Sequence, residues 1–277
     1  MSWWPFRWLQ DHGLHPLWAT VMIYSLALVV ITLWRPRAWQ QLLRTPVLWL
    51  LVLASGTTNA TFNWAVTMGD VVRVVLLFYL MPLWAVLLAR VLLGERITAV
   101  ALLRVGLALA GAAVVLWPPG GLAGGGLPLP RTLGEWLGVL GGASFALNNV
   151  LLRREAARPP EARALAMFLG GVLVSLGLAL ALAGPAGTPG AVPWPPAPAP
   201  GWVAGALAMA FAFLAGNMAL QYGASRLPAN VTAVVMVTEV LFASGSAVLL
   251  GAGTLTPARL LGGALILGAS LLSARSG

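Results

Sequence analysis

The sequence predicts an all-α protein that crosses a membrane several times. Three observations lead to this fold class. The first two are that 60% of the 277 residues are hydrophobic and that only 8% are charged. Soluble domains carry about 25% charged residues. A third observation is that several stretches of about 20 residues hold few or no charges, which is the length a helix needs to cross a bilayer core of about 30 Å.

Four helices are expected before residue 118, at 14–34, 47–68, 71–93 and 99–117. The basic segment "RPRAWQQLLRTP" (35–46), with prolines near both ends, is expected to be a loop between the first two. "PPGGLAGGGLPLPR" (118–131) cannot continue a helix, and so it ends the fourth.

Five further helices are expected, at 133–152, 164–184, 202–222, 229–250 and 257–274, for nine predicted spans in all. "GPAGTPGAVPWPPAPAPG" (184–201) has enough proline and glycine to form an irregular surface loop. Tryptophans gather near the predicted span ends, as in an aromatic belt at the membrane interface: Trp34, Trp39, Trp49, Trp117, Trp136, Trp194 and Trp202.

The arginines predict an orientation. They are scattered between apolar spans and form no patch, so the net charge of +9 indicates membrane topology and no nucleic-acid partner. If the 35–46 loop is cytoplasmic, most arginines lie at the inner face, and only Arg7, Arg73, Arg131 and Arg259 lie outside. This bias places the C-terminus in the cytoplasm of a bacterial-type inner (plasma) membrane.

Nine spans and an inner C-terminus would leave the N-terminus outside. Yet "MSWWPFRWLQDHG" (1–13) has neither the apolar core nor the cleavage site of a signal peptide. We therefore expect "WWPFRWLQ" to be the last turns of a tenth helix that is missing or only partly present, or else a short interfacial segment.

The two halves carry a weak internal repeat. With an offset of 157 residues, "WAVTMGDVVRVVLLFYLMP" (64–82) aligns without gaps to "QYGASRLPANVTAVVMVTE" (221–239). The same order of helices and short turns follows in both copies, and the predicted topology runs them in opposite directions. Inverted repeats are typical of secondary transporters, whose substrate site lies near the membrane midplane.

The copies resemble a known family. "LFYLMPLWAVLLARVLLGERITAVALLRVGLALAGAAVV" (77–115) and "TEVLFASGSAVLLGAGTLTPARLLGGALILGASLL" (238–272) are similar to the EamA-type repeat of the drug/metabolite transporter superfamily. "MIYSLALVV" (22–30), "WRPR" (34–37) and "FYLMPLW" (78–84) are similar to its aromatic amino acid exporters. The second copy departs from the family pattern at Val240, often a proline, and at Ala252-Gly253, which replace Gly-Glu.

This resemblance implies a ten-helix fold of two inverted five-helix repeats, here with the first helix missing or truncated. The implied domains are a first EamA repeat at 1–117, an extracytoplasmic linker at 118–132 and a second repeat at 133–277.

Glu239 is the only charged residue in the run 229–250. A carboxylate at mid-bilayer is costly, so it is expected to face the bundle interior or a wet cavity. Three roles are open: binding a cationic group, carrying a proton that exchanges with substrate, or bonding to a neighbouring helix. Helical spacing places Met236 on the same face.

Other polar and aromatic residues are candidates for a substrate cavity. Asn59 and Asn63 share one helix face, as do Asn217 and Gln221 on the repeat-related helix; interhelical hydrogen bonds are the alternative. Pro82 is a hinge candidate because it removes a backbone hydrogen bond. The remaining cavity candidates are Asn148, and Tyr79 and Trp64, which could stack on a planar solute, although such aromatics also serve as core.

The sequence thus predicts a secondary transporter, an exporter of a small metabolite such as an amino acid, working by alternating access. The expected partners are the lipid bilayer, a small solute and, as a candidate coupling ion, the proton. The sequence contains no phosphate-binding loop, no paired aspartates within the spans and no metal-binding histidine motif. We therefore expect neither an enzyme nor a cofactor. The alternatives are efflux of cationic drugs or dyes, and a truncated membrane protein that does not transport.

Overall fold

A computed structural model of the chain describes residues 3–117, 129–185, 188, 190–224 and 241–275. Apart from one isolated bridge between Ala183 and Val192, the regular structure of this part is helical. The helices are α1 (Trp3–Asp11), α2 (Pro16–Trp34), α3 (Arg37–Arg44), α4 (Pro46–Ala65), α5 (Val71–Phe78), α6 (Met81–Leu92), α7 (Ala99–Val115), α8 (Leu133–Arg154), α9 (Pro160–Ala181), α10 (Pro200–Ala224) and α12 (Pro257–Arg275). Residues 241–249 are also helical.

Three segments are long and apolar enough to cross a membrane by themselves: Pro16–Trp34, Val71–Leu92 and Pro160–Ala181. Shorter apolar helices cover Ala99–Val115, Pro200–Gly216 and Pro257–Leu272. α4 and α8 are as long, at 20 and 22 residues, but contain more polar residues. The chain is therefore an all-α, multi-pass membrane protein, and its less apolar long helices carry the candidate residues Asn59, Asn63 and Asn148.

The predicted spans that lie within the described residues agree with the helices to within four residues at each end. The span 229–250 lies partly outside them, because residues 225–240 are not described. The assignment of two five-helix repeats and a missing first helix stays a prediction.

Two local expectations differ from the structure. The segment 35–46 was expected to be a loop, but it contains α3, because its apolar residues Ala38 and Leu42 recur one turn apart and are buried. The span 71–93 is a pair of helices, broken at Tyr79 and Leu80 just before Pro82. Because proline has no N–H, it cannot donate to the carbonyl of Phe78 four residues earlier.

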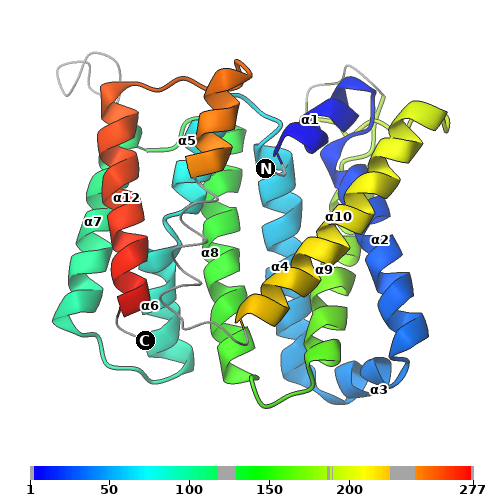
Figure 1. Cartoon of the computed structure of the whole chain (residues 1–277), viewed down its shortest axis with the longest axis horizontal. Helices are drawn as coiled ribbons and strands as arrows, with labels where there is room; N and C mark the ends of the chain where they lie inside the picture. The colour runs from blue at the N-terminus through cyan, green and yellow to red at the C-terminus, as the bar shows by residue number, and fades with distance from the viewer. Residues whose placement is uncertain (1–2, 118–128, 186–187, 189, 225–240, 276–277) are drawn as a thin grey trace.

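The elements form a bundle in which sequence-distant helices lie side by side (Figure 1). α7 packs along α12 at one edge, α4 and α8 meet in the middle, and α9 packs on both α4 and α2. The short helices α1 and α3 lie at opposite ends (Figure 1).

Glycines allow these helices to approach closely. Gly111 of α7 and Gly262 of α12 face each other, so that a Cβ on either would lie 2.6–2.7 Å from the other's carbonyl oxygen. Gly56 of α4 and Gly170 of α9 also lie close together: a Cβ on Gly56 would overlap the Gly170 carbonyl oxygen, and a Cβ on Gly170 would overlap the carbonyl oxygen of Val52. Small residues at helix contacts are the usual means of close packing within a membrane.

Candidate functional site

A cluster of polar side chains lies between α2 and α4, near the middle of α2 and in the second half of α4. The hydroxyl of Tyr24 donates to Asn59 Oδ1 over 2.6 Å, and Asn59 Nδ2 donates to the carbonyl of Ser55 over 2.8 Å. Tyr24 is buried, and Asn59 is half-buried. The predicted interhelical hydrogen bond of Asn59 is therefore present, while its role in lining a cavity stays a prediction.

One turn further along α4, Asn63 Nδ2 donates to Thr20 Oγ1 of α2 over 3.0 Å, with both residues buried. The neighbouring Trp64 packs edge-to-face against His15, with ring centroids 5.3 Å apart. The two helices are thus joined at two levels by side-chain hydrogen bonds, which satisfy polar groups that lipid could not.

Asn148 of α8 differs from these residues because its amide oxygen has no hydrogen-bond partner among the described residues. The residue is only 2% exposed, whereas Asn149 beside it is exposed. A buried amide oxygen without a partner is unfavourable. Asn148 is therefore the described candidate with unused capacity to accept a hydrogen bond.

The break between α5 and α6 lies against α8. Tyr79 is buried next to Phe78, whose ring also contacts Phe145 of α8. The carbonyl of Phe78, which Pro82 leaves without its helical donor, faces Gly142 so closely that a Cβ there would overlap it. Pro82 thus lies just after the break that divides the third predicted span into α5 and α6, and its role as a hinge stays a prediction.

The structure does not describe the side chains of four predicted site residues. Glu239 and Met236 lie outside the described residues. Asn217 and Gln221 belong to α10, but their side chains also lie outside the described part. Their predicted roles stay predictions.

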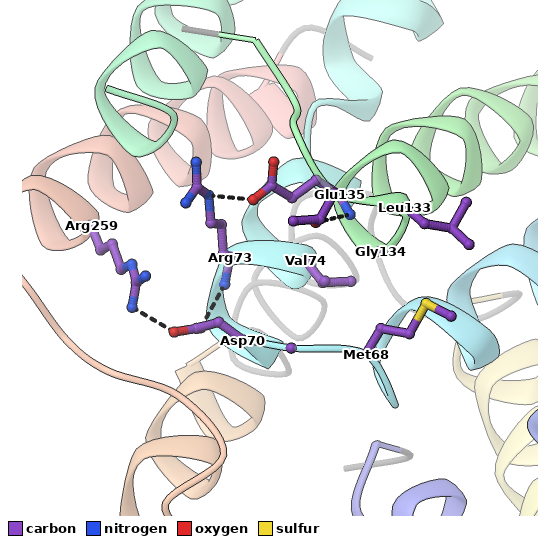
Figure 2. Close-up of a pocket in the computed structure, with 10 residues that line it drawn as sticks. Met68, Asp70, Arg73, Val74, Leu133, Gly134, Glu135 and Arg259 are labelled. Atoms are coloured by element: carbon purple, nitrogen blue, oxygen red, sulfur yellow. Dashed lines mark hydrogen bonds and ion pairs between the residues drawn. The ribbon is translucent and has the colours of Figure 1, made fainter. Parts of the chain in front are cut away.

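A pocket of about 390 Å³ opens where α5, α8 and α12 begin (Figure 2). None of the predicted cavity residues whose side chains the structure describes lines it. Its walls are Met68, Gly69, Asp70, Arg73, Val74, Thr132, Leu133, Gly134, Glu135 and Arg259.

Two ion pairs cross this pocket. Asp70, the N-cap of α5, accepts a hydrogen bond from the backbone N–H of Arg73 over 3.2 Å and pairs with Arg259 of α12 over 2.6 Å. Arg73 Nε lies 3.1 Å from Glu135 Oε1, although its N–H is not aligned for a hydrogen bond. Ion pairs therefore connect α5 to both α8 and α12 (Figure 2).

The first helix adds a third arginine at this end. Arg7 Nε donates to the carbonyl of Val66 over 2.9 Å, and its Nη2 donates to that of Gly69. Burial lowers the pKa of Arg7, while the charges of Asp11 and Asp70 raise it. Arg7 thus satisfies carbonyls that follow the C-terminus of α4, where a cation is favourable.

Sequence reasoning missed these pairings. It assigned Arg7, Arg73 and Arg259 to one membrane face, and they do lie at one end of the bundle, but it did not pair Arg73 with Glu135 or Arg259 with Asp70. A local pattern was available: Thr132 and Glu135 stand at capping-box spacing, and Thr132 caps the N–H of Glu135. The spacing does not reveal that Arg73 lies opposite, since that depends on how α5 packs on α8.

Comparison with known proteins agrees with this architecture. Residues 7–117 match the EamA-like transporter family. Over 111 residues the chain is 34% identical to the "Uncharacterized transporter PA0485" of Pseudomonas aeruginosa, a match that covers 38% of this chain and 37% of that protein. The aligned region thus spans little more than a third of the relative's length.

A solved crystal structure, described only as that of a protein, matches the fold. The similarity covers 98% of this chain and 93% of that chain, with a TM-score of 0.54 and 18% identity, and it concerns the fold alone. Residues 7–117, less than half of the chain, are thus similar to the EamA-like transporter family, and the described helices within them carry buried polar groups such as Tyr24 and Asn63.

Proposed function

We propose that the chain is a secondary transporter that exports a small metabolite, such as an amino acid, by alternating access. The observation that carries this proposal is the match of residues 7–117 to the EamA-like transporter family. The similarity to a protein named as a transporter supports the same class of activity.

Buried polar groups inside the bundle support a solute pathway. Tyr24, Asn63 and Asn148 are each less than 9% exposed and lie within long helices. Placing a polar group within a membrane costs free energy, so such groups usually face the interior of the helix bundle or a water-filled cavity. Asn148 is the described group that would accept a hydrogen bond from a solute, such as the ammonium of an amino acid.

The energy for transport would come from a gradient, because the sequence has no nucleotide-binding loop. Glu239 is the candidate for proton coupling, and Pro82 for the hinge. On this proposal the chain is not an enzyme, its C-terminus lies in the cytoplasm, and one repeat moves against the other around the polar centre.

The proposal is tested by uptake into proteoliposomes with a panel of amino acids and cationic dyes, with and without a pH gradient. Asn148→Leu is expected to lower transport by about tenfold or more, because it removes the acceptor of a hydrogen bond to the solute. Its matched control is Asn149→Leu, an exposed neighbour that should transport normally. Glu239→Gln is expected to abolish the response to the pH gradient.

Each outcome bears on a different claim. If no solute in the panel moves, the transporter assignment fails. If only dyes move, the metabolite assignment fails and drug efflux replaces it. If Asn148→Leu and Asn149→Leu behave alike, Asn148 is not part of the solute pathway.

A further inference from the structure

The short helix α3 lies at one end of the bundle (Figure 1). Its residues form three faces that differ in burial and charge. Ala38 and Leu42 are buried against the bundle. Leu43 is 65% exposed on a second side. Arg37 and Arg44 stand seven residues apart, on one stripe of the helix, and both are exposed on the third side.

Large apolar side chains surround this helix without being covered by protein. Leu33 and Trp34, at the end of α2, are 76% and 72% exposed. Trp39 is partly buried and donates its indole N–H to Thr32 Oγ1 over 3.0 Å, which fixes the approach of α3 to α2. A short helix with one apolar edge and one basic edge is suited to the boundary between acyl chains and headgroups.

The positive charge of this region is not neutralised within the described part of the chain. Arg35, Arg37 and Arg44 form no ion pair there, and residues 12–69 contain no aspartate or glutamate. At the same end of the bundle, Arg153 pairs with Glu95, and both Arg154 and Arg158 pair with Glu155. Arg90, Arg96 and Arg163 at this end also form no ion pair among the described residues, but α3 and its flank are where such arginines lie beside the exposed Leu33, Trp34 and Leu43.

We propose that α3 and Arg35 form a binding surface for the headgroups of anionic phospholipids, such as phosphatidylglycerol. Guanidinium groups match the geometry of a phosphate. Leu33, Trp34 and Leu43 would contact the acyl chains of the same lipid, which a soluble anion does not have. The surface does not depend on the transported solute or on which leaflet α3 faces.

The test is native mass spectrometry of the full chain in detergent micelles, titrated with phosphatidylglycerol or with phosphatidylcholine of the same acyl chains. The wild type is expected to prefer phosphatidylglycerol. Each arginine near an anionic surface contributes about fivefold in affinity. The triple variant R35Q/R37Q/R44Q should therefore lose about 100-fold in phosphatidylglycerol affinity and leave phosphatidylcholine binding unchanged.

The matched control is R153Q/R154Q/R158Q, which removes the same charge from the same end of the bundle at arginines that already have partners. It should lose less than about fivefold. R35K/R37K/R44K keeps the charge and should keep most of the preference, and circular dichroism should show wild-type helicity for all three variants. Equal losses in the two glutamine variants, no preference in the wild type, or equally tight binding of glycerol phosphate would overturn the proposal.

Discussion

Arg259 shows how a single side chain connects distant parts of this chain. It reaches from the first turn of α12 to Asp70, the N-cap of α5, with both side chains largely shielded from water, at 16% and 23% exposed. The same carboxylate accepts a hydrogen bond from the backbone N–H of Thr254 over 3.3 Å. Asp70 thus organises the start of α5 and the turn before α12 together.

Replacing Arg259 with glutamine should lower the free energy of unfolding by about 1–2 kcal/mol, because Asp70 then loses its charged partner in a partly buried site. Thermal unfolding in detergent measures this effect. Arg158→Gln is the control: it removes an exposed i,i+3 pair with Glu155 and should cost less than about 0.5 kcal/mol. Equal effects would mean that the pocket shields its ion pairs no better than the surface does.

His15 predicts a dependence of stability on pH. It caps α2 just before Pro16, and burial lowers its pKa from 6.5 to about 4. Between these values the unfolded chain binds a proton that the folded chain does not, so stability contributed by His15 falls as the pH drops from about 6.5 to about 4. His15→Gln should flatten this part of the curve of unfolding temperature against pH.

At the scale of elements, the contact of α8 with α5 is set by glycine. Gly138 and Gly142 are one turn apart on α8; the first approaches the carbonyl of Val74, and the second approaches that of Phe78. Apolar periodicity predicts both helices, but it does not predict how closely they approach. Their separation follows from the absence of side chains along one stripe of α8.

Gly142→Ala should lower the free energy of unfolding by about 3 kcal/mol, since the added methyl overlaps the Phe78 carbonyl and α5 must shift. Gly177→Ala in α9 is the matched control. A Cβ at Gly177 would meet nothing within 4 Å, so the change should be neutral or stabilising by up to about 1 kcal/mol. The interpretation fails if both variants unfold at the same temperature.

For the whole molecule, alternating access requires that contacts between the two proposed repeats open and close. One such contact joins α5 to the turn before α12, where a Cβ on Gly253 would lie 3.5 Å from the Cβ of Val72. This separation is within the range of a disulfide. The chain has no native cysteine, so an introduced pair is free of competing thiols.

V72C/G253C, when oxidised, should lose transport in proteoliposomes and regain it after reduction. G184C/A191C is the control, since it joins two points of the loop between α9 and α10, within one proposed repeat; a Cβ on Gly184 would lie 2.9 Å from that of Ala191, so the loop must widen by about 0.6 Å for the disulfide to form. Its oxidation should leave transport unchanged. Undiminished transport by oxidised V72C/G253C would show that this end of the bundle does not open.

The sequence by itself determined the fold class and the positions of the long apolar segments, because a bilayer demands such segments, whose backbone bonds close internally; it did not show α3 or the break between α5 and α6. It also placed Asn59, Asn63 and Asn148 in membrane helices and brought Arg7, Arg73 and Arg259 to one end. Tertiary structure alone decided that Asn59 bonds to Tyr24, that the Asn148 amide oxygen has no hydrogen-bond partner in the described part of the chain, and that Arg73 meets Glu135 while Arg259 meets Asp70. Side-chain partners across helices depend on the rotation and separation of whole helices, which the glycine contacts set and no local pattern encodes.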